Sequence, residues 1–501
     1  MSQVILFKSG NRITVEPTTP SILQLLQPIL TFTEKIFLRG RERYQAEREG
    51  RSPLRFQDWE CFGFDHKDRL STSFGFYRRI IDKLKAAGYE AGLEDLTPHP
   101  HPEIFEPHWD RLADFTLRPG QPEFLSRLIA YPCGRFDCAP GFGKTFMIGL
   151  VALLLPKARI DVVTKRVTIL TTRIYPELCG MLPSVGIYCS RQKRNLGARV
   201  MCFSAGSLRH TDGKADITIG DECHELGADS FAEQMAVYQR ARCFGFSGSQ
   251  DMRLDGKDTR VEGIFGPVIY RVPYQTAERN EIVVPIEVTW RDVNLSRNPC
   301  EGLVDTAKRR YGIWRNADRN RLIAADARLY DEKTQVLISV DTLEHAVRLK
   351  KLLPEFALVY AAGGLSSKDR ETYVQARLLS QDEPSMTDQR LKAITKDFEV
   401  GNLKKAIATT VWNVGVDFRA LNVVICTDAG ASPINATQIR TRVSRINEGK
   451  SIGRVHDYLD QFDPGYRRNA TSRSKVYAKH GWSQVYPPKP QKDSLLYSLQ
   501  D

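Results

Sequence analysis

A glycine-rich loop between a predicted strand and a predicted helix narrows the choice of folds. The run GRFDCA leads into APGFGKT, residues 139–145, and the apolar run FMIGLVALLL follows directly. This order of strand, loop and helix is that of a P-loop, in which backbone N–H groups and a helix N-terminus surround phosphates. We therefore expect a parallel α/β sheet that binds a nucleotide at this loop.

The residue types of the loop suit ATP with Mg²⁺. Gly141 and Gly143 lack a Cβ, so their backbone amides can turn toward phosphates. Lys144 would neutralise the β- and γ-phosphates, and Thr145 would bind Mg²⁺. An ordinary glycine-rich turn is the alternative, which the flanking strand and helix argue against. The expected ATP-binding residues of the loop are Pro140, Gly141, Phe142, Gly143, Lys144 and Thr145.

A pair of carboxylates follows another predicted strand. The run ADITIG alternates apolar residues and ends in DECHE, residues 221–225. Catalytic groups of open parallel sheets gather at the carboxyl ends of the strands. Asp221 would hold Mg²⁺, and Glu222 would deprotonate the water that attacks the γ-phosphate. Alone, such a pair is more often a solvated turn, but the P-loop upstream favours catalysis.

Two series of β-rich runs alternate with segments able to form helices, at residues 136–272 and 335–458. This pattern predicts two tandem parallel α/β domains, joined near residues 273–300. The Pro-rich stretch TPHPHPEIFEP, residues 97–107, separates a first segment that we expect to form a small α+β domain. The expected divisions are 1–108 for this accessory domain, 109–282 and 283–460 for the two α/β domains, and 461–501 for a basic helix and tail.

Composition excludes several classes of protein. The chain has 501 residues, of which 42% are hydrophobic, enough for more than one core. The apolar stretch Gly149 to Leu155 is far shorter than the roughly 20 residues of a membrane span, and the first eight residues lack a signal-peptide core. We expect a cytoplasmic protein without a membrane partner, in the host cytoplasm if a phage encodes it.

The cysteine pattern and the net charge limit the kinds of site and partner that we expect. Ten cysteines occur without a CxxC pair or a Cys/His cluster, so neither a disulfide framework nor structural zinc is expected. The 72 Lys and Arg against 60 Asp and Glu give a net charge of +12. That excess favours a polyanionic partner such as nucleic acid, although a merely basic surface is an even alternative.

The motifs together resemble those of superfamily 2 helicases. The segment DECH, residues 221–224, is similar to their DEAD/DEAH box, with Cys223 in the variable position. The segment SGS, residues 247–249, stands in the place of their S/T-A-T motif, and its surroundings resemble the UvsW and XPB-type branch. Cys138 replaces the first glycine of the general P-loop. The resemblance implies RecA-like domains, and it implies that His224 couples the nucleotide site to SGS.

Two more motifs of this family have counterparts in the second α/β series. IATTVWNVGVDF, residues 407–418, resembles motif V, which implies that Thr409 or Thr410 contacts a nucleic-acid phosphate and that Gly415 and Asp417 face the nucleotide cleft. QIRTRVSR, residues 438–445, resembles motif VI, with Thr441 where glycine is usual.

On a helix, Gln438, Arg442 and Arg445 would lie on one side. The resemblance implies that Arg445 acts as an arginine finger with Arg442 as its partner. A solvated basic face is the alternative.

The remaining matches are weaker. LRPGQ, residues 117–121, resembles the LRPYQ segment at the start of the motor in these helicases, although Gly120 replaces the tyrosine. The resemblance implies that Gln121 recognises adenine. Nucleic-acid contacts are expected from motifs Ia and Ib, with basic or buried loops as alternatives. The candidates are Thr164, Lys165, Arg166, Ser204 and Ser207. Near the N-terminus, aromatic residues 74–77 could contact nucleic acid, but a core role is favoured.

These observations predict an ATP-dependent DNA helicase or translocase that remodels or unwinds DNA, including branched DNA, as a monomer. The contacts would go to phosphates, so binding should be largely independent of sequence. Two alternatives stay open. One is an RNA helicase, since no motif reads the 2′-hydroxyl. The other is a nucleic-acid-binding module with a degenerate motor, which the departures at Cys138, Thr441 and SGS would suit.

Overall fold

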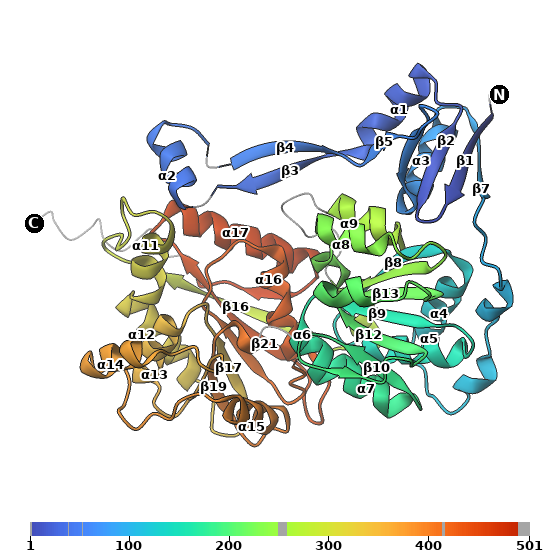
Figure 1. Ribbon diagram of the computed structural model, residues 1–501. Helices are drawn as coiled ribbons and strands as arrows, with labels where there is room; N and C mark the ends of the chain where they lie inside the picture. Colours follow the sequence, from blue (N-terminus) through green and yellow to red (C-terminus); the bar gives the residue numbers. More distant parts are fainter. Residues whose placement is uncertain (1–2, 39, 53, 249–257, 413–415, 489–501) are drawn as a thin grey trace, which may run out of the picture. The chain divides into compact units, whose positions relative to one another are not determined.

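The computed structural model describes residues 3–38, 40–52, 54–248, 258–412 and 416–488. The chain divides into two compact units, Met1–Ile282 and Val283–Asp501, and each contains a large, mainly parallel sheet with helices around it (Figure 1). The predicted α/β class with tandem RecA-like domains is confirmed. The finer division into 1–108, 109–282, 283–460 and 461–501 stays a prediction.

A small mixed sheet begins the first unit. Its strands lie in the order β5-β6-β2-β1-β7, with β1 and β7 parallel and the other neighbours antiparallel. The strands are β1 Gln3–Ser9, β2 Arg12–Glu16, β5 Phe62–Phe64, β6 Leu70–Ser73 and β7 Glu90–Asp95. The helices α1 Pro20–Leu30 and α3 Tyr77–Ala86 bury their apolar residues against it. Phe74, Phe76 and Tyr77 are at most 8% exposed, which confirms the core role for these aromatics.

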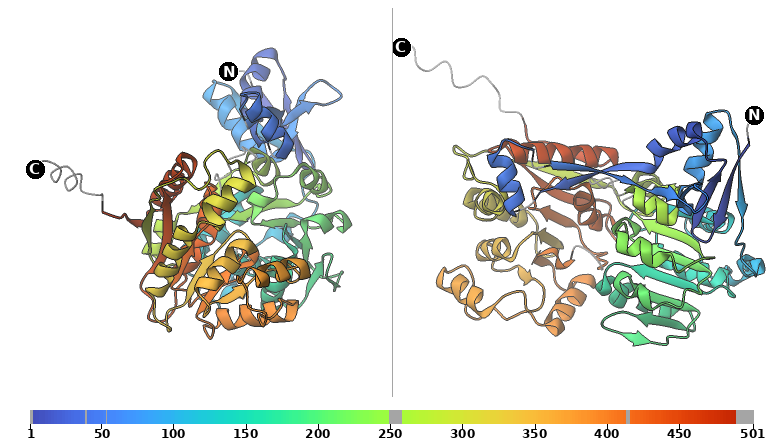
Figure 2. Two further views of the ribbon diagram at one scale, coloured as in Figure 1. Left: turned by 90° about the vertical axis from the view of Figure 1, so that its left-hand side faces the viewer. Right: turned by 45° about the horizontal axis from the view of Figure 1, so that its top comes forward.

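A two-stranded ribbon is inserted into this small domain. Strands β3 Thr31–Phe37 and β4 Leu54–Glu60 pair antiparallel and carry α2 Gly40–Arg48 at their far end (Figure 2). At its base the ribbon is attached to the first unit by Arg260, whose guanidinium lies 4.4 Å from the Trp59 ring and 5.3 Å from the Phe32 ring. Such contacts matter because an isolated hairpin is marginally stable in water.

The large sheet of the first unit has the strand order β11-β10-β12-β9-β13-β14-β8-β15. Neighbours are parallel except β10 and β11. Its central strands are buried along their whole length, as expected where helices cover both faces. The strands are β8 Cys133–Cys138, β9 Ile160–Thr164, β10 Val185–Tyr188, β11 Lys193–Arg194, β12 Val200–Ser204, β13 Ile217–Asp221, β14 Arg242–Ser247 and β15 Val268–Val272.

In the described part of the first unit, five short 3₁₀ turns and one π-helical turn lie among the α-helices. Besides α1, α2 and α3, the α-helices are α4 Gln121–Ala130, α5 Lys144–Leu154, α6 Val167–Ile169, α7 Tyr175–Met181, α8 Asp229–Met235, α9 Asp258–Phe265 and α10 Tyr274–Arg279. The π-helical turn is η4 Leu170–Ile174, and the 3₁₀ turns near the site are η5 Ala205–His210 and η6 Cys223–Glu225. Further 3₁₀ turns are η1 Phe74–Phe76, η2 Pro102–Phe105 and η3 Trp109–Leu112.

Within the first unit, the small domain packs on the large sheet through a buried carboxylate. Glu262 of α9 accepts hydrogen bonds from Arg79 of α3 at 2.9 and 2.6 Å, and Arg135 of β8 lies 3.5 Å from the same carboxylate. Gly75 lies so close that a Cβ there would be 2.1 Å from the carbonyl oxygen of Glu262. The two domains therefore meet without a gap at this point.

The sheet of the second unit is parallel throughout, in the order β18-β19-β17-β20-β21-β16-β22. Several helices begin at side-chain caps, for example Asn316, Thr342 and Asp463. The strands are β16 Ile286–Val293, β17 Val336–Ser339, β18 Ala357–Val359, β19 Lys405–Ala408, β20 Val423–Cys426, β21 Gly453–Asp460 and β22 Ser483–Val485. The helices and turns are α11 Asp305–Arg309, η7 Arg310–Trp314, α12 Ala317–Arg328, α13 Leu343–Leu352, α14 Ser367–Gln375, α15 Asp388–Glu399, η8 Thr410–Trp412, α16 Pro433–Gln438, η9 Arg440–Ser444 and α17 Pro464–Lys479.

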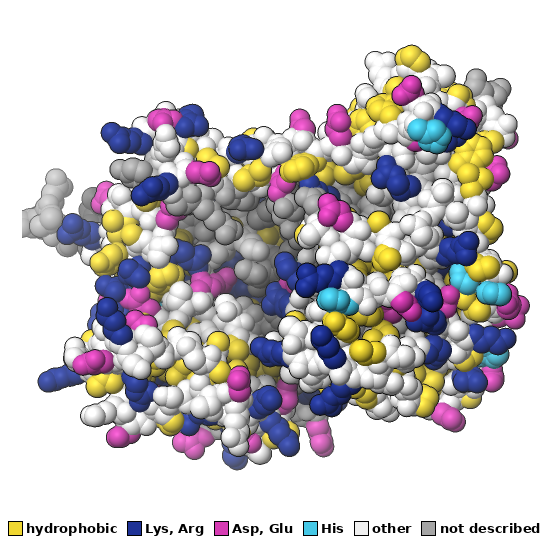
Figure 3. All heavy atoms as spheres, in the orientation of Figure 1, with side chains coloured by type: hydrophobic (Ala, Val, Ile, Leu, Met, Phe, Trp, Pro, Cys, Tyr) yellow, Lys and Arg dark blue, Asp and Glu magenta, His cyan; other side chains and the backbone are white. Residues whose placement is uncertain are grey.

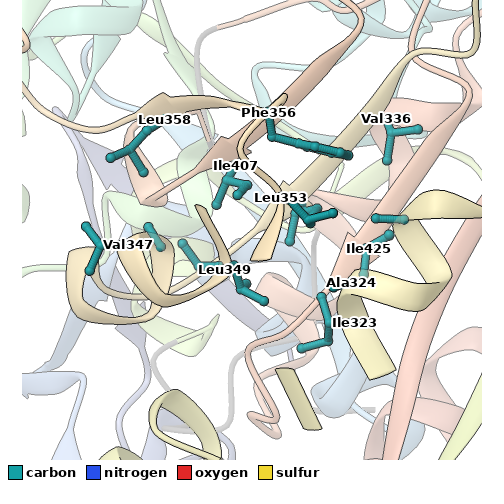
Figure 4. Close-up of a cluster of buried hydrophobic side chains, with 14 of the residues drawn as sticks. Ile323, Ala324, Val336, Val347, Leu349, Leu353, Phe356, Leu358, Ile407 and Ile425 are labelled. Carbon is teal, nitrogen blue, oxygen red and sulfur yellow. The ribbon is translucent and has the colours of Figure 1, made fainter. Parts of the chain in front are cut away.

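The core of this unit lies between the sheet and α12 and α13. Ile323 of α12, Leu349 of α13 and Leu353, which directly follows α13, meet Val336 and Ile407 from the strands (Figure 4). All five side chains are fully buried.

The basic helix expected after residue 461 is α17. It is attached to the sheet by Arg473, which is 1% exposed and pairs with Asp457 at 3.0 Å, and by the buried Tyr477. Strand β22 then joins the edge of the sheet beside β16. Residues 489–501 of the expected tail lie outside the described residues. No helix within the described ranges is long and apolar enough to cross a membrane.

Candidate active site

The motifs of the first unit meet at the carboxyl edge of its large sheet. The P-loop follows β8, Ser247 ends β14, and Asp221 ends β13, and these three strands are neighbours in the order β13-β14-β8. In the register of these strands, Asp221 lies beside Phe246 and Ser247 beside Asp137. Parallel strands therefore bring residues far apart in the sequence to one edge.

The P-loop has the backbone shape that its glycines predict. Gly141 and Gly143 have φ values of 92° and 89°, in the left-handed region that favours glycine. The Gln121 side chain donates to the carbonyl oxygen of Phe142 at 2.8 Å and accepts from the amide of Arg118 at 2.9 Å. Helix α5 begins at Lys144, so its N-terminus points into the loop. The loop is a cradle that fits phosphates.

The carboxylate and the lysine expected for catalysis are within reach of each other. Lys144 Nζ lies 3.9 Å from Glu222 Oε1. Glu222 itself has φ 49° and ψ 49°, a left-handed conformation that is uncommon for a residue with a side chain. Backbone strain of this kind is concentrated at functional sites, where the surrounding structure holds it in place.

The two carboxylates of the pair differ in acidity. Burial raises the pKa of Asp221 to about 6, and the neighbouring Glu222 adds to this shift. Burial alone would raise the pKa of Glu222 as well, but Lys144 and His224 lower it below its ordinary value. Glu222 is thus ionised at neutral pH, as a general base has to be.

Hard oxygen donors for Mg²⁺ are present beside the cradle. They are the hydroxyl of Thr145 and the carboxylate of Asp221, both at most 6% exposed. The described residues contain no group of three or more His, Cys, Asp or Glu side chains that could bind a metal. This donor set fits Mg²⁺, which is usually bound by one or two protein groups together with phosphates and water.

The DECH and SGS motifs are joined by a hydrogen bond. His224 Nδ1 lies 2.8 Å from Ser247 Oγ, and both side chains are buried. The next residue, Gly248, faces the P-loop, since a Cβ there would be 2.9 Å from the carbonyl oxygen of Cys138 and 3.5 Å from Lys144 Nζ. Ser249 lies outside the described residues.

Sequence reasoning missed the surroundings of Gln121. Arg118 donates to the carbonyl oxygen of Gly141 at 3.1 Å, so a second side chain of the LRPGQ segment holds the P-loop. Gly120 has φ 86°, and Tyr270 of β15 donates to its carbonyl oxygen at 2.7 Å. A cavity of about 460 Å³ opens beside Gly120, between α4, β15 and α10. No feature of the sequence linked Tyr270 to residue 120.

The candidate nucleic-acid contacts of the first unit differ in exposure. Thr164 and Ser204 end adjacent strands and are buried, and Ser204 Oγ donates to Ser207 Oγ at 2.8 Å. Lys165 is exposed. Arg166 is also exposed, and its Nε donates to Glu225 at 2.9 Å. Their binding to nucleic acid stays a prediction.

The second unit corrects the expected helix of motif VI. Helix α16 ends at Gln438, a 3₁₀ turn covers Arg440–Ser444, and Arg445 is extended, so Gln438, Arg442 and Arg445 do not share one α-helical face. A side-chain hydrogen bond competes here with the backbone hydrogen bonds of a helix, since the Thr441 hydroxyl donates to the carbonyl oxygen of Thr437 at 2.9 Å.

The arginines of this segment have different partners. Arg440 is fully buried and pairs with Asp428 at 3.0 Å and with Asp457 at 3.1 Å, which makes it a core residue. Arg445 Nε lies 2.9 Å from Asp417 Oδ1.

The other motif V and VI candidates are placed as follows. Arg442 donates to the carbonyl oxygen of Val416. The Thr409 amide donates to Val359, Thr410 is exposed, and Gly415 lies outside the described residues.

Comparison with known proteins agrees with this fold. Residues 320–447 match the model of the helicase conserved C-terminal domain. The resemblance to superfamily 2 helicases is confirmed. A protein of Sulfolobus islandicus filamentous virus (isolate Iceland/Hveragerdi), named helicase 22, is 22% identical over 293 residues, which are 56% of this chain and 47% of that protein. The match thus spans about half of the viral helicase.

Two of the solved structures that this chain resembles come from a restriction enzyme and from a phage protein. A fragment of an HsdR subunit of a type I restriction enzyme from Vibrio vulnificus YJ016 is 14% identical, with a TM-score of 0.50 over 82% of this chain and 74% of that one. The UvsW protein of phage T4 is 15% identical, with a TM-score of 0.41 over 97% of this chain and 99% of that one. At 14% identity, the likeness to the HsdR fragment concerns the fold alone.

Proposed function

We propose that the chain is an ATP-driven DNA helicase or translocase. The observation that carries this proposal is the carboxyl edge of the first large sheet, where Lys144 lies 3.9 Å from Glu222 and His224 bonds to Ser247 at 2.8 Å. Hydrolysis of a γ-phosphate requires a loop that holds phosphates and a general base close together. The P-loop and Glu222 are these two parts, and the hydrogen bond of His224 to Ser247 links them to the SGS motif. Nucleotide binding alone would not require an ionised Glu222 beside Lys144.

Each residue has a separate task in the proposed reaction. Glu222 accepts the proton of the attacking water, and Lys144 neutralises phosphate oxygens in the cradle. Thr145 and Asp221 would hold Mg²⁺, which when bound neutralises charge on the β- and γ-phosphates. Gln121, held against the loop by Phe142 and Arg118, would contact adenine.

Coupling to movement would come from the second unit. We propose that Arg445 and Arg442 supply guanidinium groups to the bound nucleotide and that Asp417, Gly415 and Gln438 belong to the same nucleotide-responsive surface. An arginine finger contributes roughly 10³–10⁵ in rate. The Asp417 carboxylate holds Arg445 at 2.9 Å and would have to release it for this role.

The proposed substrate is DNA, held through its phosphates. The net charge of +12 and the basic residues Lys165 and Arg166 support a polyanionic partner. Thr164, Ser204, Ser207, Thr409 and Thr410 are the further contacts that the motifs propose. Remodelling of branched DNA, by a monomer in the cytoplasm, rests on the resemblance of the motifs to UvsW-type enzymes.

The test is steady-state ATP hydrolysis by the purified chain, alone and with single-stranded, duplex and forked DNA and single-stranded RNA at equal nucleotide concentration. Glu222→Gln serves as the blank, because it removes the base and keeps the shape of the side chain. We expect stimulation by DNA, greatest with forked DNA. Stimulation by RNA alone would assign an RNA helicase. Hydrolysis no higher than the blank with every nucleic acid would assign a binding module with a degenerate motor.

A further inference from the structure

A cluster of arginines surrounds a single carboxylate in the second unit, apart from the motifs described above. Glu344, in the first turn of α13, lies 3.1 Å from Arg310 Nε, 2.5 Å from Arg315 Nε and 3.8 Å from Arg348 Nη2. The carboxylate is 12% exposed, whereas the three guanidinium side chains are 43%, 38% and 26% exposed. The arginines therefore present their outer edges to solvent while sharing one anion.

The charges of this surface do not balance. On the adjacent helix α11, Lys308 pairs with Asp463 at 2.9 Å and Arg309 pairs with Asp341. Together with the cluster, these ion pairs join five cations to three carboxylates. Within the described residues, no carboxylate other than Glu344 forms an ion pair with Arg310, Arg315 or Arg348. Like charges held this close repel, and a bound anion would remove the repulsion.

An aromatic side chain accompanies the excess charge. Tyr311 is 45% exposed, and the Arg315 guanidinium lies 5.5 Å from its ring centroid. Basic groups beside an exposed aromatic ring are the combination with which proteins hold single nucleic-acid strands, through phosphates and base stacking. Figure 3 shows Lys and Arg side chains gathered on its left-hand side, in the area that α11 and α12 occupy in Figure 1.

The backbone here is unusual as well. Residues Arg310–Trp314 form a π-helical turn between α11 and α12. Such turns are rare, and they occur frequently at functional sites. This turn places Arg310 and Tyr311 next to each other on the exposed side, because Gly312, Ile313 and Trp314 are buried.

We propose that Arg310, Arg315 and Arg348, gathered by Glu344, form a binding site for the phosphodiester backbone of a single nucleic-acid strand, with Tyr311 contacting a base. The site deepens the proposed function, on which it rests, since it assigns strand contacts to residues that are not among the nucleic-acid contacts proposed above. Arginine suits this task because its planar guanidinium can bind two phosphate oxygens at once. Glu344 is the anion that the three guanidinium groups share before a strand binds, so its carboxylate competes with phosphate for them.

The experiment measures binding of fluorescently labelled oligothymidine to the full chain by anisotropy, over a series of KCl concentrations. The test variant is Arg310→Gln with Arg315→Gln. The matched control is Arg321→Gln, an exposed arginine of α12 that pairs with Asp318. We expect the double variant to bind at least tenfold more weakly at low salt. Its log–log salt slope should be shallower by about 1.4, since single strands contribute about 0.7 for each phosphate neutralised. The control should match the wild type.

Glu344→Gln separates binding from folding. Removal of the carboxylate leaves the three guanidiniums without their shared anion, so Tm should fall while affinity for oligothymidine stays equal or increases. If Glu344→Gln weakens binding as much as the double arginine variant does, the cluster is structural and the inference is wrong. If the wild type binds oligothymidine and the double variant behaves like Arg321→Gln, this site alone is wrong. If the wild type binds no oligothymidine although DNA stimulates its ATP hydrolysis, the inference is wrong and the proposed function stands. If neither is observed, the proposed function fails as well.

Discussion

Individual residues at the carboxyl edge of the first sheet are held in positions that unconstrained side chains would avoid. Glu222 has a left-handed backbone, and Asp221 beside it is buried with its pKa raised to about 6. The structure keeps these groups in place through the strands around them, since β13 is buried from end to end. Rigid placement of this kind lowers the reorganisation that a reaction requires.

The close approach of Gly248 to the P-loop predicts a defect in nucleotide binding. In Gly248→Ala, the new Cβ would be 2.9 Å from the carbonyl oxygen of Cys138, closer than van der Waals contact allows. We expect the KM for ATP to rise at least fivefold, as roughly 1 kcal/mol of strain would produce. Gly180→Ala is the control, because nothing lies within 4 Å of a Cβ there. An unchanged KM in Gly248→Ala would contradict the observed loop geometry.

Asp161 predicts a pH-dependent stability. Burial raises its pKa from 3.8 to about 6, although Tyr238 and Thr211 donate hydrogen bonds to it. The folded state thus binds this proton more tightly than the unfolded state does. The stabilisation is present below about pH 4 and is lost as the pH rises through 6, a change of about 3 kcal/mol.

Asp161→Asn keeps an oxygen acceptor and cannot ionise. Relative to the wild type, its Tm should therefore rise between pH 4 and pH 7, measured by thermal unfolding in buffers of equal ionic strength. A difference in Tm that is the same at both pH values would show that the carboxyl does not titrate in this range.

At the scale of elements, the sequence predicts the regular parts well and the irregular parts poorly. The P-loop between β8 and α5, and the carboxylates after β13, follow from apolar runs and glycines that act locally. The helix expected for residues 438–445 fails, because Arg440 turns inward to Asp428 and Asp457, which are distant in sequence. Strand β22 was also not expected, since three residues with a polar side chain at two positions carry no clear strand pattern.

The sequence also could not predict which of the candidate nucleic-acid contacts are exposed to solvent. Thr164 and Ser204 are polar and follow apolar runs, but the sheet buries both. The ion pair of Arg445 with Asp417 joins residues of two motifs that sequence reasoning treated separately. Long-range pairing of charges is decided by the tertiary fold, which no local pattern encodes.

The contact of the small domain with α9 predicts a loss of stability. Glu262→Gln removes the charge that Arg79 and the buried Arg135 share. Loss of one partner of a buried ion pair costs about 3–5 kcal/mol, and the partial exposure of Arg79 places this case at the lower end. We expect a lower Tm and faster proteolysis between residues 96 and 120. Glu123→Gln, in an exposed pair with Arg127, should change neither, and equal effects in both variants would rule out a special role for Glu262.

For the whole molecule, the net charge of +12 makes binding depend on salt. If Lys and Arg contacts to phosphate dominate, the logarithm of the affinity for duplex DNA should fall linearly with the logarithm of salt concentration, by about 0.9 for each phosphate neutralised. Anisotropy titrations at several KCl concentrations give this slope. An affinity that does not change with salt concentration would contradict binding through phosphates and favour recognition through bases.

The contact between Gly120 and Tyr270 limits how the chain can change. Residue 120 has φ 86°, and a Cβ there would be 2.7 Å from the Tyr270 hydroxyl, which itself bonds to the carbonyl oxygen of residue 120. Replacement of Gly120 by a larger residue would therefore both meet the Tyr270 hydroxyl and strain the left-handed backbone. A change at residue 270 would relieve the contact but not the backbone strain, so the effect of a substitution at residue 120 depends on residue 270. Directed evolution of this turn would therefore have to vary residues 120 and 270 together.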